Sequence, residues 1–295
     1  MLTRSLFLVV TALFAGTALP AAAVPFAGLV IGIGNQLVGF DSATPGTITS
    51  TLNVTGLRAS ENLSSIDTRP ATGELYAVGS RQVGIPGSLY TINTATGAAT
   101  FVATIGNPIS ESDIAFDPVT DTLRLVDTDE RNVRVNPVTG AAVVDGSLTY
   151  AVGDVNAGGN PFVGALAYTN QDQDPATGTQ LFGIDLARGT LVRLDNPNSG
   201  VLTTVGSTGA NFASFGGFDI VAPTTAFAST GILPGVTGFY SINLSTGAAT
   251  LIGTNVITLV DIAQAQINTP VPEPTSLSLL GLGLVGLLAA RRRVS

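Results

Sequence analysis

Two stretches of the chain, LYTINTATGAAT at residues 89–100 and FYSINLSTGAAT at residues 239–250, have nearly the same sequence. In each, an aromatic and β-branched run leads to an asparagine, a Thr-Gly turn follows, and a second run leaves. Asparagine bonds its own backbone two positions on, and glycine accepts a positive φ, so the pattern predicts a short β-hairpin. Weaker copies occur at Leu37–Leu52, Val133–Val144 and Leu181–Leu194.

The hairpins recur roughly every 40–60 residues, which is the length of a four-stranded propeller blade with variable loops. A second kind of hairpin lies between them, because Ile66–Tyr76 matches Ile114–Leu123. Val260–Ala263 repeats the first strand of this unit, but no further strands follow it, whereas Leu29–Leu52 supplies later strands without a first one. Pairing the two segments would close a ring and remove the exposed edges. We therefore expect an all-β fold, a single closed β-propeller of about five blades over residues 28–268.

The N-terminal residues have the three parts of a secretory signal peptide. Arg4 is followed by the apolar run Leu6–Phe14, and small residues at Ala21 and Ala23 suit a signal peptidase. The alternative, a retained membrane anchor, is disfavoured because the apolar run is short. Residues 1–23 are therefore expected to be removed during export.

The C-terminal residues 269–295 combine a Pro-Glu-Pro motif, the apolar run Leu277–Ala290 and three terminal arginines. The run is shorter than the roughly 20 residues of a typical membrane span, and an ordinary short tail anchor is the alternative. The tail resembles the PEP-CTERM sorting signal of Gram-negative bacteria, which implies processing by exosortase and an association with exopolysaccharide and biofilm. The residues that carry the resemblance are Val271, Pro272, Glu273, Pro274, Arg291, Arg292 and Arg293.

The body of the chain resembles an uncharacterised bacterial domain of unknown function that has propeller-like repeats. The matching motifs are the hairpins above, Asp113–Pro118, Val152–Gly158 and Ala167–Asn170. This resemblance implies a fold and an exported location, and it brings no established activity. Residues 158–161 and 171–179 depart from the repeat and are expected to be loops.

The composition excludes several kinds of chemistry. The chain has no cysteine and no histidine, and all 12 of its Lys+Arg residues are arginine. Zinc sites of the Cys/His kind, Ser-His-Asp or Cys-His catalysis and lysine Schiff bases are therefore absent. A net charge of −8 disfavours a nucleic-acid partner, and it suits cations or neutral glycans better.

Acidic residues are the remaining candidates for a site. Asp113, Asp219 and Asp261 recur at the start of expected innermost strands. They would either surround a central channel as cation ligands or catalytic carboxylates, or bond backbone amides of the next blade. Repetition favours the second, structural role, because every blade has the same joint.

Two loops offer alternating oxygen ligands of the kind that calcium uses, Asp127 with Asp129 and Asp172 with Asp174. Neither loop has the glycine and distal glutamate of an EF-hand, and solvated turn acids are the alternative interpretation. Calcium is thus the one cofactor that the sequence leaves open.

The sequence favours an exported scaffold or binding module at the cell surface or in the extracellular matrix, with exopolysaccharide or matrix proteins as partners. The membrane would be contacted only transiently, by the C-terminal helix of an anchored precursor. The alternative is a carboxylate-based glycoside hydrolase or lyase acting on the exopolysaccharide. No catalytic residue is assigned, because the chain has few glutamates and no tryptophan to stack a sugar.

Overall fold

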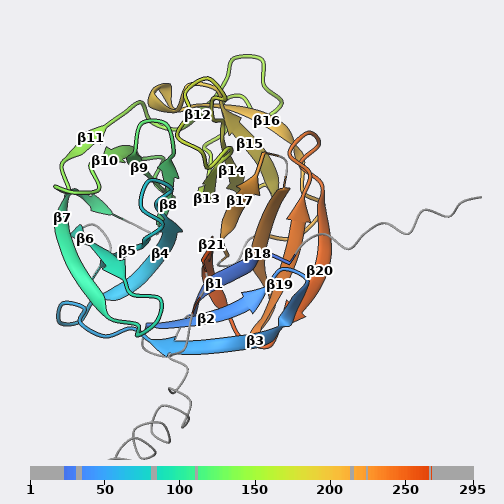
Figure 1. The fold of residues 1–295 in the computed structure, drawn as a ribbon. Coiled ribbons are helices and arrows are strands. Elements are labelled where there is room, and N and C mark those ends of the chain that lie inside the picture. Colours follow the sequence, from blue (N-terminus) through green and yellow to red (C-terminus); the bar gives the residue numbers. More distant parts are fainter. Residues whose placement is uncertain are drawn as a thin grey trace, which may run out of the picture.

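The computed structural model describes residues 23–30, 35–80, 85–109, 112–212, 216–223, 225–265 and 267. These residues form five sheets arranged as a ring (Figure 1), with one 3-10 turn at Pro197–Ser199. Among them, no helix is long and apolar enough to cross a membrane. Ala21 and the expected sorting tail lie outside the described residues. The all-β prediction is confirmed.

Each sheet is a blade, and we number the blades along the chain, naming strands from the centre outward. Blade 1 contains β21 (Leu259–Gln264), β1 (Pro25–Val30), β2 (Gln36–Asp41) and β3 (Thr44–Asn53). Blade 2 contains β4 (Asn62–Thr68), β5 (Leu75–Ser80), β6 (Ile85–Ile92) and β7 (Ala99–Ile109). Blade 3 contains β8 (Ser112–Asp117), β9 (Thr122–Asp127), β10 (Asn132–Val135) and β11 (Ala142–Val144).

Blade 4 has a fifth strand at its outer edge. Its strands are β13 (Val163–Tyr168), β14 (Leu181–Asp185), β15 (Thr190–Leu194), β16 (Val201–Ser207) and β12 (Thr149–Tyr150). Blade 5 contains β17 (Phe218–Ala222), β18 (Thr225–Leu233), β19 (Val236–Ile242) and β20 (Ala249–Asn255). Five blades agree with the number expected from the repeats.

The ring closes inside blade 1, where the last strand pairs with the first. β21 runs antiparallel to β1, with Leu29 opposite Asp261 and Ala27 opposite Ala263. This is the pairing predicted from the two incomplete ends of the repeat array. The first strand begins at Pro25, slightly ahead of the domain start expected at residue 28.

All five hairpins predicted from the repeat form, and four of them join the third and fourth strands of a blade. Leu181–Leu194 forms β14 and β15, the second and third strands of blade 4. In that blade the outer connection runs from β15 to β16 through the 3-10 turn. The hairpin predicted at Leu181–Leu194 is confirmed. It takes a different place in its blade from the other four, because Asp185 and Gly189, whose φ is 58°, supply the turn chemistry between the second and third strands.

The hydrophobic core lies between the blades, since each sheet packs one face on each neighbour. Between blades 1 and 5, Phe26 packs against Phe227 and Phe239 with ring centroids 5.4 and 5.5 Å apart. Between blades 2 and 3, the rings of Tyr76 and Phe116 meet edge to face at 5.1 Å. These contacts hold neighbouring blades together and fix the geometry at the centre of the ring.

Candidate functional site

Polar side chains of the five innermost segments link each blade to the next around the centre of the ring. In blade 3, Asp113 accepts hydrogen bonds from the backbone N–H of Leu166 in blade 4, at 2.6 Å, and from its own neighbour Ile114 at 2.9 Å. In blade 1, Asp261 accepts from the N–H of Ile66 in blade 2 at 2.7 Å. Both carboxylates are buried.

The remaining joints follow the same rule with other residues. In blade 5, Asp219 accepts from the N–H of Gln264 in blade 1 at 2.5 Å. In blade 2, Asp67 accepts from the N–H of Phe116 in blade 3 at 2.6 Å. Blade 4 has no acid at its joint, and the Nε2 of Gln171 instead donates to the carbonyl oxygen of Ile220 in blade 5 at 3.2 Å.

Every joint therefore has at least one side chain bonded to the backbone of the following blade, and the joint of blade 2 has a second in Ser65, whose hydroxyl accepts from the N–H of Ile114 at 3.0 Å. Asp113, Asp219 and Asp261 make the hydrogen bonds that the structural interpretation of the sequence requires. Because buried carboxylates need hydrogen-bond donors, these backbone bonds also account for the acids at the centre of the ring.

An open cavity of about 280 Å³ lies at the end of the ring where the innermost strands terminate. It is walled by two carboxyl groups, two carboxamides, one hydroxyl and three apolar residues. They are Asp67, Asp219, Gln171, Gln264, Thr68, Pro25, Pro70 and Ala265. The cavity thus adjoins three of the five joints, and no arginine contributes to its wall.

The acids fall into two electrostatic pairs along the centre of the ring. Burial, and then the negative charge of Asp219, raise the pKa of Asp67 well above its ordinary value. Burial raises the pKa of Asp219 to about 6. Deeper in the ring, burial and the charge of Asp113 raise the pKa of Asp261, while burial raises the pKa of Asp113 to about 7. At neutral pH the centre therefore carries less negative charge than four carboxylates would.

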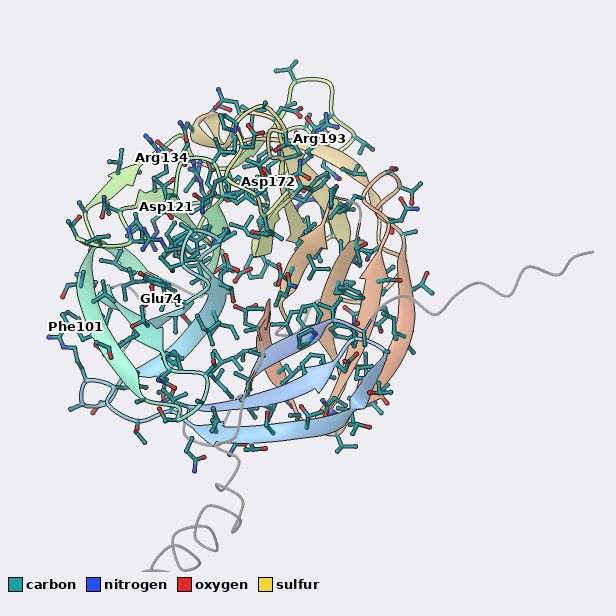
Figure 2. The ribbon with its side chains drawn as sticks, in the orientation of Figure 1. Glu74, Phe101, Asp121, Arg134, Asp172 and Arg193 are labelled. Carbon is teal, nitrogen blue, oxygen red and sulfur yellow. The ribbon has the colours of Figure 1, made fainter. Side chains whose placement is uncertain are left out.

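In the structure, the acidic side chains of the two loops considered for calcium are bonded to other groups of the chain. Asp127 is fully buried and forms an ion pair with Arg131 at 2.7 Å, and the exposed Asp129 pairs with the same arginine at 3.0 Å. Asp172, on the long loop of blade 4 (Figure 2), accepts from the N–H of Asp174 at 3.0 Å. Within the described parts of the chain, no group of three or more acidic side chains is placed to hold a metal ion.

Sequence reasoning missed Asp67, Gln171 and Gln264 as residues of one site. The sequence does contain a signal for Asp67. Ser65 occupies the position in the repeat that Asp113 occupies in blade 3, and Asp67, two residues after Ser65, lies on the same side of the strand. Gln171 and Gln264 follow the ends of different innermost strands, and only the closed ring brings them together.

Comparison with known proteins identifies the two parts of the chain. A family model described as "Domain of unknown function (DUF4394)" matches residues 36–263, and a model of the PEP-CTERM protein-sorting motif matches residues 270–293. No curated protein matches the chain.

Several solved structures are similar to this chain at low sequence identity. A functionally unknown protein from Desulfotomaculum acetoxidans is 14% identical, with 80% of this chain and 70% of that chain covered and a TM-score of 0.39. A Lactobacillus plantarum protein is 14% identical over 85% and 69%, with a TM-score of 0.43. The periplasmic gluconolactonase of Pseudomonas aeruginosa is 14% identical over 85% and 69%, with a TM-score of 0.40.

The sorting motif indicates export to the cell surface or extracellular region and processing by exosortase. Its match covers Val271, Pro272, Glu273, Pro274 and the three terminal arginines, as the sequence predicted. The body match covers most of the ring. The chain belongs to the DUF4394 family of domains of unknown function, and it is an exosortase-sorted surface protein.

Proposed function

We propose that the exported ring is a non-enzymatic binding module that holds a neutral sugar unit of the extracellular polysaccharide in the cavity at its centre. The observation that carries this proposal is the chemistry of the cavity wall. Carboxyl and carboxamide groups can accept and donate hydrogen bonds to sugar hydroxyls. The wall contains both kinds of group, in Asp67 and Asp219 and in Gln171 and Gln264.

The charge of the wall argues for a neutral ligand. The cavity has two acids and no arginine, so a uronate, sulfate or phosphate group would meet repulsion without a compensating cation. Pro25 and Pro70 add apolar surface on which the C–H faces of a sugar ring can pack. A volume of about 280 Å³ accommodates one sugar unit or a chain end better than a long segment.

The joint hydrogen bonds support binding in preference to catalysis. Asp219 accepts from the backbone of Gln264, and Asp67 accepts from both Phe116 and Thr68. These bonds engage both oxygens of Asp67 and one oxygen of Asp219, which a general acid or base would need for the substrate's proton.

Calorimetric titration of the released protein with neutral oligosaccharides from the host exopolysaccharide tests the proposal. The side chain of Gln264 is exposed at the cavity, and Gln264→Ala should weaken binding about 2- to 10-fold, the effect of one lost neutral hydrogen bond. Gln36→Ala is the control, because Gln36 lies on β2 and is not part of the cavity wall. Absence of binding, or equal affinity in both variants, would contradict the proposal.

A second candidate function, glycoside hydrolysis or lyase chemistry, is favoured by one observation. Asp67 and Asp219 share the cavity, and burial raises the pKa of both. A protonated acid beside an ionised one is the arrangement that glycosidases use. Turnover of the exopolysaccharide by the purified protein, abolished by Asp219→Asn and retained by Asp174→Asn, would replace the binding proposal with this one.

A further inference from the structure

The chain that leaves the last strand is seated in blade 1 rather than hanging free of the ring. Ala265 lines the cavity, and two residues later Ile267 is buried in the cluster between blades 1 and 2. The hydroxyl of Ser50 on β3 donates to the carbonyl oxygen of Ile267 at 2.9 Å, in a buried position. We call this contact the tail clasp.

Blade 1 has a space shaped for the tail clasp. Gly39 on β2 lies opposite Ser50 in the sheet register. A Cβ at Gly39 would meet the Cβ of Ile267 at 3.2 Å and the Ser50 hydroxyl at 2.3 Å. A larger residue at position 39 would therefore displace the clasp, so the exit of the chain is fixed by packing and by a hydrogen bond.

Little chain separates the tail clasp from the sorting motif. The motif begins at residue 270, three residues after Ile267, so a fully extended chain reaches at most about 11 Å from the clasp. Residue 270, where the motif begins, is five residues after Ala265 on the cavity wall and so at most about 18 Å from it. A membrane enzyme that encloses the start of the motif must therefore work within about 18 Å of the cavity wall.

We propose that exosortase docks over the cavity-bearing end of the ring when it takes the sorting motif, so that the cavity becomes accessible only after processing. The tail clasp sets this geometry, because it holds the chain at the ring up to Ile267. The inference goes beyond the proposed function, since it concerns access to the cavity and stands whether the ligand is a sugar or not.

The absence of cysteine from the chain allows a direct test with single-cysteine variants and a membrane-impermeant maleimide. Gln264→Cys reports on the cavity. Val155→Cys is the control, because Val155 is 85% exposed and is not part of the cavity wall. It lies beside the outer strand β16, where Thr204 is bonded to the neighbouring Asp154 and Asn156. Labelling rates are compared in the unprocessed protein bound to a catalytically inactivated exosortase and in the released protein.

Gln264→Cys should be labelled about tenfold more slowly in the exosortase-bound form than in the released form. This is the rate expected if the bound enzyme leaves the cavity accessible to the maleimide for about one-tenth of the time. Val155→Cys should be labelled equally in both forms. A flexible Gly/Ser insertion after Ile267 should restore fast labelling of Gln264→Cys, because it moves the enzyme away from the ring.

Three results would overturn the proposal. The first is equal labelling of Gln264→Cys in the two forms, and the second is an equal slowing of both cysteines. The third is the same slowing in cells without exosortase, which would make the membrane surface the shield. Since maleimide labelling needs no sugar, failure here leaves the proposed function untouched, and failure of sugar binding leaves this proposal untouched.

Discussion

The Thr-Gly turn between β6 and β7 touches the neighbouring blade, so we expect Gly97→Ala to destabilise the ring. Gly97 has a φ of 75°, and a Cβ there would meet the carbonyl oxygen of Asn53 on β3 at 2.4 Å. The N–H of Thr55 also donates to the carbonyl oxygen of Gly97 at 3.0 Å. The turn thus joins blade 2 to blade 1.

The chain offers a matched control in the Thr-Gly turn between β4 and β5. Gly73 has a φ of 71°, but a Cβ there would meet nothing within 4 Å. A left-handed conformation costs about 1–2 kcal/mol for a residue with a Cβ, and both variants suffer this cost. A methyl group forced into a filled contact adds about 1–3 kcal/mol, and only Gly97→Ala suffers that.

Thermal unfolding of the released protein, followed by circular dichroism, measures the difference. For a domain of this size, about 1 kcal/mol lowers the midpoint by about 2–4 °C, so Gly97→Ala should melt roughly 2–12 °C below Gly73→Ala. Gly140→Ala and Gly247→Ala should behave like Gly97→Ala, because Cβ atoms there would meet backbone oxygens of the preceding blade at 2.5 Å. Equal losses at Gly97 and Gly73 would refute the role of the turn in docking the blades.

Three further outcomes are expected. Burial raises the pKa of Asp113 to about 7 and that of Asp219 to about 6. The folded state therefore binds protons more readily than the unfolded chain, whose aspartates have a pKa of about 3.9. The melting temperature should fall as the pH rises from about 4 to about 7. Replacing both acids by asparagine should reduce this dependence, and the part that remains comes from Asp67 and Asp261, whose pKa burial also raises. Removing metal ions with a chelator should leave the melting temperature unchanged, since Asp127 already has an arginine partner and Asp172 forms a turn. A lower melting temperature with the chelator would instead support a bound calcium ion. Mass spectrometry of the secreted protein should find a chain that begins after Ala23 and lacks the terminal arginines, and a retained arginine cluster would exclude processing.

Much of the fold was predictable because its signals are local. Asparagine or aspartate and glycine at fixed offsets specify a hairpin wherever they occur, and all five predicted hairpins form. The same locality explains why the hairpin at Leu181–Leu194 joins other strands of its blade than the remaining four do, since turn chemistry does not specify which two strands are joined. Closure was predictable for another reason, because Val260–Ala263 and Leu29–Leu52 are complementary fragments of one repeat.

The cavity was not predictable from the same signals, because its wall combines residues from several blades. Asp67 and Asp219 are more than 150 residues apart in the sequence. The burial and, after it, the repulsion by Asp219 that raise the pKa of Asp67 exist only in the closed ring. Gln264 has no distinguishing pattern around it. Its place in the site depends on the end of β21 lying beside the end of β4, where Thr68 donates to the Gln264 carbonyl oxygen at 2.8 Å.

The position of the cavity coincides with a break in the repeat. Three blades supply an aspartate at the repeat position, and blade 2 supplies Asp67 two residues later on the same side of its strand. Blade 4 has Ala165 at the repeat position, and Gln171 on its long loop makes the joint instead. A perfectly repeated ring would surround its centre with equivalent acids and present no preferred side to a ligand. Substituting an amide donor for one acid, beside the displaced Asp67, gives one end of the ring both donors and acceptors, which is the asymmetry that the binding proposal requires.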